Sequence, residues 1–208
     1  KSISFLSIAI CLSEKLFNII ANINSSSGLS ILAKRQFLDL DFRANLWDNV
    51  LEFGSVIKKY LKLIDIVIGT EEEVLSLELK NPNQVKIKND SITQPEVMGN
   101  LNDSIKMILD KGVKLLLVKT GSKGVIAYYN DGRVIKIPGF SVEVTNVLGA
   151  GDAFAGGFIY GYLNGWDDYK SLRLANACGA WLVTKQGCCN FAPYYDEIIH
   201  FIEEKGGF

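Results

Sequence analysis

The sequence predicts an α/β fold, a mostly parallel sheet covered by helices on both faces. Up to residue 119, apolar runs of strand length alternate with longer segments of helical period, which is the pattern of βαβ units. Two further apolar runs flank Asn130-Asp131-Gly132, a sequence typical of the turn in an antiparallel hairpin. The rest of the chain has helical period. We therefore expect residues 1–208 to form a single three-layer αβα domain with an appended antiparallel hairpin.

The expected elements follow in order along the chain. Strands are expected at residues 3–10, 36–40, 63–68 and 113–119, and crossover helices at residues 14–34, 46–62 and 101–111. The hairpin strands are residues 125–129 and 133–137, and the later helices are residues 150–163, 169–185 and 195–205. Residues 80–96 are polar and contain Pro82 and Pro95, so we expect a long surface loop there.

The composition is that of a folded soluble protein, with 48% hydrophobic and 22% charged residues. With a net charge of -1, the chain lacks the excess of positive charge that binds nucleic acid or an anionic membrane. We therefore expect neither as a partner. A single histidine, His200, excludes a His-rich zinc site. We interpret the four cysteines, two of them adjacent, as reduced thiols, which favours a cytoplasmic location. The apolar run at residues 3–10 is too short to span a bilayer.

A glycine turn followed by an acid is the most informative motif. Its residues are Gly149, Ala150, Gly151 and Asp152, and they open an expected helix. Backbone N–H groups and the positive end of the helix dipole converge there, which favours an anion. The turn amides could hold a migrating phosphoryl group while Asp152 accepts the proton of a hydroxyl. The same residues also suit a loop with a capping aspartate, and the spacing alone does not separate the two interpretations.

Two other nucleotide-binding motifs are absent from the sequence. No Gly-x4-Gly-Lys-Ser/Thr string exists, and Phe154 stands where the dinucleotide fingerprint needs its third glycine. A nicotinamide dehydrogenase is disfavoured for that reason. Small residues recur in this helix and the next one, at Gly156, Gly157, Gly161, Ala175, Ala177, Gly179 and Ala180. They allow a close approach to the backbone, either by another helix or by the flat base of a nucleotide.

With these motifs in this order, the sequence resembles the ribokinase-like, PfkB-type carbohydrate kinases, whose C-terminal signature centres on Gly-Ala-Gly-Asp. The likeness covers nearly the whole chain. Its other parts are Asp39-Leu40-Asp41-Phe42-Arg43, Thr70-Glu71-Glu72-Glu73, Val118-Lys119-Thr120-Gly121-Ser122-Lys123-Gly124, and Asn176 with Gly187. The resemblance implies a three-layer αβα ribokinase-like fold and an ATP-dependent transfer of a phosphoryl group to a primary hydroxyl of a sugar.

The resemblance also implies roles for individual residues. Asp152 is the expected catalytic base, assisted by the amides of Gly149, Ala150 and Gly151. We expect the sugar to bind to Asp41, Arg43 and Asp152. We expect Glu73 to contact Mg²⁺ through water. The residues expected to bind the nucleotide are Thr70, Lys119, Thr120, Gly121, Gly124, Gly151 and Asn176.

Within the family, the motifs are most similar to those of members that phosphorylate 5-dehydro-2-deoxy-D-gluconate in myo-inositol breakdown. Kinases of fructose, ribose or 2-keto-3-deoxygluconate are the alternatives, as is a non-catalytic nucleotide-binding fragment. The expected partner is a small sugar or sugar acid. A homodimer stays open, because family members often pair through their lids.

Three departures from the family pattern qualify these expectations. Thr70 replaces the usual Asn, so the magnesium role rests mainly on Glu73. Asn146 stands where many members have Asp, which puts their monovalent-cation site in doubt here. The N-terminal sugar-binding strands and β-lid have no counterpart, and the chain starts without Met. We therefore expect a part of a longer gene product.

Overall fold

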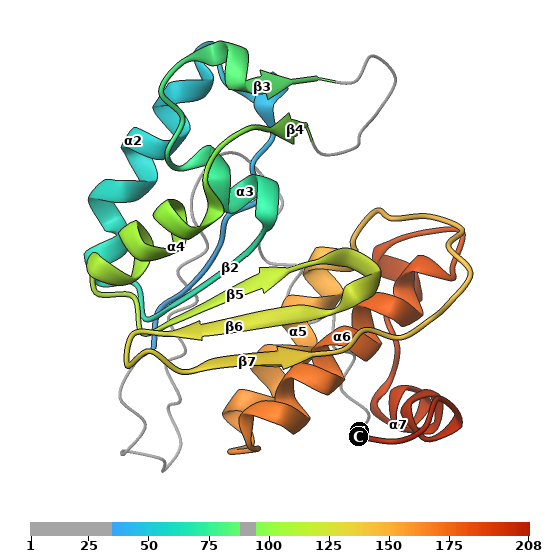
Figure 1. Cartoon of the computed structure of the whole chain (residues 1–208). Helices are drawn as coiled ribbons and strands as arrows, with labels where there is room; N and C mark the ends of the chain where they lie inside the picture. The colour runs from blue at the N-terminus through green and yellow to red at the C-terminus, as the bar shows by residue number, and fades with distance from the viewer. Residues whose placement is uncertain (1–34, 88–94) are drawn as a thin grey trace, which may run out of the picture. The chain divides into compact units, whose positions relative to one another are not determined.

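The computed structural model describes residues 35–87 and 95–208, and Figure 1 shows their elements. The strand expected at residues 3–10 and the helix expected at residues 14–34 lie outside this part of the chain. The strands are β1 (Phe37–Asp39), β2 (Ile66–Thr70), β3 (Val85–Lys86), β4 (Glu96–Val97), β5 (Leu115–Lys119), β6 (Val125–Tyr129) and β7 (Val134–Ile137). The helices are α2 (Val50–Tyr60), α3 (Glu71–Ser76), α4 (Leu101–Asp110), α5 (Ala150–Leu163), α6 (Asp168–Val183) and α7 (Tyr195–Glu204).

The main sheet has the strand order β1-β2-β5-β6-β7. Strand β2 pairs in parallel with β1 on one side and with β5 on the other. The residues from Ile66 to Ile68 are buried, as central strands of a parallel sheet require. Figure 1 shows β6 running opposite to β5 and β7, and the turn between β6 and β7 places Gly132 at φ +89°. The prediction of a mostly parallel sheet with an appended hairpin is confirmed.

The described residues divide into two compact units. Residues 35–87, 95–119 and 126–135 form the sheet unit, and residues 120–125 and 136–208 form the helical unit. In the sheet unit, α2, α3 and α4 bury apolar side chains against β1, β2 and β5. This core includes Leu38, Phe53, Ile57, Val67, Val74, Leu77, Ile105, Ile108 and Leu116.

The helical unit is organised by the close packing of α5 against α6, which lie side by side in Figure 1. A Cβ added at Gly157 would lie 2.9 Å from Cys178 Sγ, and one added at Gly161 would lie 2.7 Å from Ser171 Oγ. Another helix therefore uses the space that these two glycines leave. For this pair, the helix-packing interpretation of the small residues holds.

Two local expectations differ from the structure, and one short helix was not predicted. Strand β2 starts at Ile66 because residues Leu61–Leu63 form a 3-10 turn that closes with a hydrogen bond from Ile64 N–H to the Leu61 carbonyl. The segment expected as a loop at residues 80–96 contains β3 and the first residue of β4, which pair antiparallel through Val85 and Val97. Helix α3 spans 6 residues, too few to leave a helical period in the sequence.

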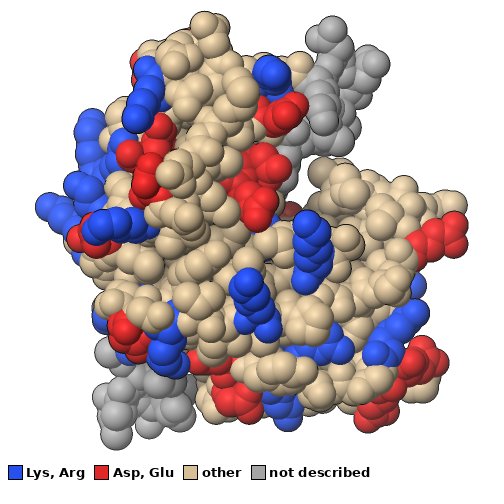
Figure 2. All heavy atoms as spheres, in the orientation of Figure 1, with Lys and Arg blue, Asp and Glu red and all other residues tan. Residues whose placement is uncertain are grey.

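None of the helices in residues 35–87 and 95–208 combines the length and apolar character needed to cross a bilayer. On the face that Figure 2 shows, the described acidic and basic side chains are interspersed.

Candidate active site

The first group of expected site residues lies at the carboxyl ends of the parallel strands in the sheet unit. Strands β1, β2 and β5 end at Asp39, Thr70 and Lys119, and Thr70 stands opposite Lys119 in the strand register. The carboxyl ends of adjacent parallel strands meet at one edge of the sheet, where open α/β sheets bind their ligands. The sequence therefore brings a hydroxyl, a carboxylate and an ammonium to this edge.

A capping box fixes Glu73 beside this edge. The hydroxyl of Thr70 accepts a hydrogen bond from Glu73 N–H (3.2 Å), and Glu73 Oε2 accepts one from Thr70 N–H (2.7 Å). This reciprocal arrangement starts α3 directly after β2. Glu71 is exposed and Glu72 is half-buried, whereas Glu73 is buried. Of the three acids, only Glu73 has its carboxylate held at the strand ends.

The Lys119 ammonium lies between two carboxylates. Its Nζ atom is 3.3 Å from Asp39 Oδ1 and 3.8 Å from Glu73 Oε2. The exposed fractions of the three side chains are 13% for Lys119, 21% for Asp39 and 3% for Glu73. We call these three residues the Lys119 cluster. The expected nucleotide contact of Lys119 stays a prediction, and the structure gives its ammonium two carboxylate partners.

The charges of the Lys119 cluster shift one another's pKa values. Burial raises the pKa of Asp39 and of Glu73, and the charge of Lys119 offsets only part of this rise. Burial also disfavours the charged form of Lys119, but the two carboxylates outweigh this effect and raise its pKa above the ordinary value of 10.5. The cluster thus contains more buried negative charge than one ammonium compensates.

The expected sugar-facing pair, Asp41 and Arg43, follows β1. Asp41 has φ +41°, in the left-handed region that Asp tolerates better than most residues. Its Oδ1 lies 2.6 Å from Nη2 of Arg43. Asp41 is exposed and Arg43 half-buried. Exposed ion pairs contribute little to stability, so the Arg43 guanidinium can exchange this partner for an acidic ligand at small cost.

In the helical unit, Thr120, Gly121 and Gly124 form one tight turn. Both the N–H and the hydroxyl of Thr120 donate to the Gly124 carbonyl, at 2.8 and 3.0 Å. Gly124 has φ +102°, and a Cβ there would overlap the Ile137 carbonyl oxygen. Only glycine fits that position, because both the backbone angle and the close neighbour exclude a side chain. The turn therefore lies against the end of β7.

Asn176 of α6 binds the same strand end. Its Nδ2 donates to the Pro138 carbonyl at 3.0 Å and to the Ile137 carbonyl at 3.3 Å. Gly179, three residues further on the same helix, approaches the glycine turn, since a Cβ there would lie 3.3 Å from the Ala150 carbonyl oxygen. Helix α6 thus connects the expected nucleotide turn with the glycine turn, although Asn176 was expected on the nucleotide itself.

The glycine turn has the geometry that an anion site requires. Gly149 has φ +82° and precedes α5, whose first turn carries Asp152. The Ala150 N–H donates to the Val147 carbonyl at 3.3 Å. Within the described residues, the N–H groups of Gly149 and Gly151 donate no hydrogen bond. Two of the three expected amides are therefore available to a ligand, and the Asp152 carboxylate is exposed beside them.

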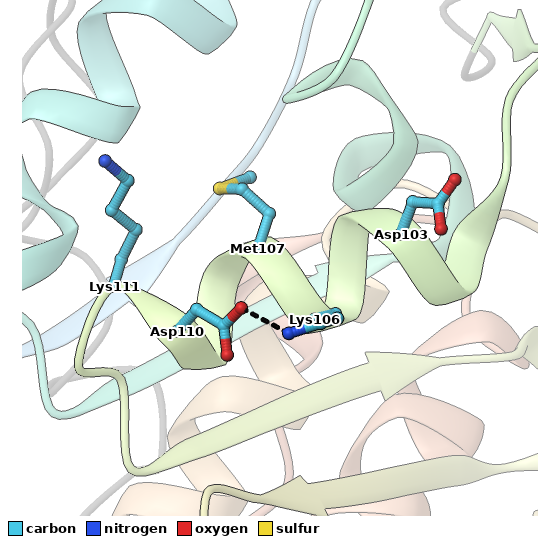
Figure 3. A pocket seen from close by; sticks show the side chains of 5 residues that line it. All are labelled: Asp103, Lys106, Met107, Asp110 and Lys111. Atoms are coloured by element: carbon cyan, nitrogen blue, oxygen red, sulfur yellow. Dashed lines mark hydrogen bonds and ion pairs between the residues drawn. The ribbon is translucent and has the colours of Figure 1, made fainter.

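A surface hollow of about 400 Å³ lies on α4, and none of its lining residues is an expected site residue. Its lining residues are Asp103, Lys106, Met107, Asp110 and Lys111, and Figure 3 shows that they all project from the helix or its end. Lys106 and Asp110 form an exposed ion pair one helical turn apart, at 2.7 Å. The hollow offers no converging polar groups beyond this pair, so it is not a candidate catalytic site.

Sequence reasoning did not assign a role to Asp39. It named Asp39 only as part of a motif, although an acid at one strand end and a lysine at another were both visible. Their pairing depends on the strand order, because β2 separates β1 from β5 in the sheet. A prediction of the strand order would have indicated that Asp39 and Lys119 lie at the same edge of the sheet.

Comparisons with known proteins found one matching family model and several named relatives. Residues 27–194 match the model of the pfkB family carbohydrate kinase. The chain is 35% identical over 167 residues to the 5-dehydro-2-deoxygluconokinase of Clostridium botulinum (strain Alaska E43 / Type E3), covering 80% of this chain and 45% of that protein. It is 33% identical over 171 residues to the 5-dehydro-2-deoxygluconokinase of Clostridium tetani (strain Massachusetts / E88), covering 82% of this chain and 47% of that protein.

A solved structure shows the same fold. The putative ribokinase II of E. coli in complex with ATP and Mg²⁺ superimposes with a TM-score of 0.64 at 30% identity, covering 80% of this chain and 47% of that chain. The ribokinase-like fold class is therefore confirmed. The chain spans about half the length of the curated relatives it matches. Its strand-end residues and glycine turn lie within one continuous match to a single family model, and the chain belongs to the pfkB family of carbohydrate kinases.

Proposed function

We propose that this chain carries the nucleotide-binding and catalytic residues of an ATP-dependent sugar kinase. The observation that carries the proposal is the glycine turn, in which two available amides and the exposed Asp152 stand at the start of a 14-residue helix. The family membership supports the same function. Because the relatives in the comparison are named for 5-dehydro-2-deoxygluconate, we propose 5-dehydro-2-deoxy-D-gluconate as the acceptor, which would place the protein in myo-inositol catabolism in the cytoplasm.

The residues present fit a nucleotide phosphate bound with Mg²⁺. The amides of Gly149 and Gly151 suit phosphate oxygens. Within the described residues, no group of three or more His, Cys, Asp or Glu side chains is placed to hold a metal ion. Mg²⁺ usually keeps several waters and binds through substrate phosphates and one or two carboxylates, so Glu73 acting through water suits this arrangement. When bound, Mg²⁺ neutralises charge on the nucleotide phosphates.

The proposed reaction forms one O–P bond and breaks another. Asp152 accepts the proton of the acceptor hydroxyl as its oxygen attacks the γ-phosphorus, and the bond from that phosphorus to the bridging oxygen of ADP breaks. The amides of Gly149 and Gly151 stabilise the charge on the transferring phosphoryl group. The Ala150 amide, expected to take part, would first have to leave the Val147 carbonyl.

The acceptor would be recognised at the strand ends of the sheet unit. The Arg43 guanidinium has the planar fork that matches a carboxylate, and the proposed acceptor is a sugar acid. Asp41 would accept hydrogen bonds from sugar hydroxyls. The nucleotide contacts of Thr70, Lys119, Thr120, Gly121, Gly124 and Asn176 remain predictions, and so does a homodimer. The Asn146 side-chain oxygen accepts from Leu148 N–H at 3.0 Å, and a monovalent-cation site at Asn146 stays a doubtful prediction.

Coupled detection of ADP tests the proposal on the 208-residue chain. We expect turnover with 5-dehydro-2-deoxy-D-gluconate and less with fructose, ribose or 2-keto-3-deoxygluconate. A preference for one of these other sugars would move the protein to another kinase of the family. ADP binding without turnover on any sugar would favour the non-catalytic nucleotide-binding fragment. Absence of both binding and turnover would contradict the proposal.

The left-handed turn residue gives a prediction with a matched control. Gly149→Ala and Gly165→Ala both place an alanine at positive φ, +82° and +70°, so each should lose about 1–2 kcal/mol of unfolding free energy. An added Cβ at Gly149 lies 3.1 Å from Leu182 Cδ2, whereas Gly165 has nothing within 4 Å. Only Gly149→Ala should displace the phosphate-binding amides, lowering turnover about 100-fold. Equal turnover in the two variants would separate the glycine turn from catalysis.

A further inference from the structure

The Lys119 cluster contains an ammonium, 13% exposed, to which the proposed bond-forming step gives no role. Lys119 is the last residue of β5, Asp39 is the last residue of β1, and Glu73 lies in the first turn of α3. The cluster therefore joins three elements at the strand-end edge. One ammonium and two carboxylates sum to a formal charge of one negative unit.

Two contacts fall on the same oxygen of Glu73. Its Oε2 atom accepts the Thr70 N–H at 2.7 Å and lies 3.8 Å from the Lys119 ammonium. One contact comes from its own capping box and the other from a neighbouring strand. Together they restrict the orientation of the Glu73 carboxylate. The capping box alone would hold it only to its own 6-residue helix.

We infer that Lys119 is a positioning residue, whose ammonium, held by Asp39, fixes the Glu73 carboxylate in the orientation that serves the Mg²⁺ of the bound nucleotide. The inference rests on the proposed function, because it assigns Lys119 to the support of Glu73. Losing a group that orients a metal-facing side chain typically lowers metal affinity about 10- to 100-fold.

A purely electrostatic role for Lys119 predicts the opposite result. A cation repels Mg²⁺, so removing the ammonium would strengthen the Mg²⁺ response if charge alone mattered. Positioning predicts a weaker response. When the net charge of the cluster is held constant, charge alone predicts an unchanged response, so a weaker response indicates positioning.

The double variant Asp39→Asn/Lys119→Met satisfies this condition. It removes one negative and one positive charge, so the formal charge of the cluster stays at one negative unit while the ammonium is lost. Lys119→Met alone would take the shared ammonium from both Asp39 and Glu73, and the double variant avoids this excess of negative charge, which would destabilise the fold. Lys114→Met is the matched control, because Lys114 pairs with Asp65 at 2.7 Å before β5 and its side chain is 57% exposed.

The measurement is ADP binding by titration calorimetry at increasing MgCl₂, with thermal unfolding recorded for each variant. We expect the double variant to need about 10- to 100-fold more Mg²⁺ for the same gain in ADP affinity. Lys114→Met should match the wild type. In a Glu73→Gln background, Lys119→Met should add no further loss, since the residue through which it acts is gone.

The failure of the inference and that of the proposed function give different results. A folded double variant with an unchanged or stronger Mg²⁺ response would overturn the positioning role while leaving the kinase proposal intact. Absence of Mg²⁺-dependent ADP binding in the wild type would overturn the proposed function and, with it, the inference.

Discussion

Replacing Asp152 by Asn should lower turnover by about 10²- to 10⁴-fold, the usual contribution of a positioned general base. Asn keeps the size of the side chain, but it cannot accept the proton of the acceptor hydroxyl. Because Asp152 is exposed in the first turn of α5, the change should cost little stability. ADP affinity should stay close to that of the wild type, as measured by calorimetry beside the coupled assay.

Asp168→Asn is the matched control for this prediction. Asp168 also lies in the first turn of a helix, α6, and belongs to the same helical unit. It should therefore report any general effect of removing a first-turn acid without touching the glycine turn. Turnover retained in Asp152→Asn, or lost equally in Asp168→Asn, would remove Asp152 from the role of base.

The elements best predicted from sequence are those with strong local signals. Helix α5 spans Ala150–Leu163 as expected, because the glycine turn marks its start unambiguously. Helix α7 begins at Tyr195 as expected. Strand β2 was placed too early, since the apolar residues Leu61 and Leu63 suit a 3-10 turn as well as a strand. Leu63 is 56% exposed, which no apolar pattern reveals.

The sequence indicated where the candidate site residues stand along the strands and turns, but not which side chains contact one another. The sequence located Thr70 and Glu73 after one strand and Lys119 at the end of another, and the structure joins them at one sheet edge. It did not foresee that Asn176 would donate to the Ile137 and Pro138 carbonyls. Side-chain partners of this kind depend on tertiary packing, whereas the turn chemistry of Gly124 and Gly149 is local.

Replacing Lys119 by Met should destabilise the protein by about 3–5 kcal/mol at pH 7, because it removes the ammonium that the buried Glu73 carboxylate and the half-buried Asp39 carboxylate share. Lys114→Met breaks an ion pair whose lysine is 57% exposed and should cost no more than about 1 kcal/mol. Urea unfolding of both variants and the wild type measures the difference. Equal losses would show that the Lys119 cluster behaves as an ordinary surface ion pair.

The loss caused by Lys119→Met should shrink as the pH falls. Burial already raises the pKa of Asp39 and of Glu73 above 3.8 and 4.5, against the lowering effect of Lys119, and the variant removes that lowering effect. A carboxyl with a raised folded-state pKa binds its proton more tightly in the folded than in the unfolded chain. The folded variant therefore regains stability as the pH falls through those raised pKa values.

In the wild type, the contribution of the Lys119 charge persists at neutral pH and disappears only above 10.5, as the pH rises through its raised pKa. Unfolding measured between pH 7 and about pH 4 should thus show the variant approaching the wild type, and a constant difference would mean that the two carboxyls stay ionised without Lys119.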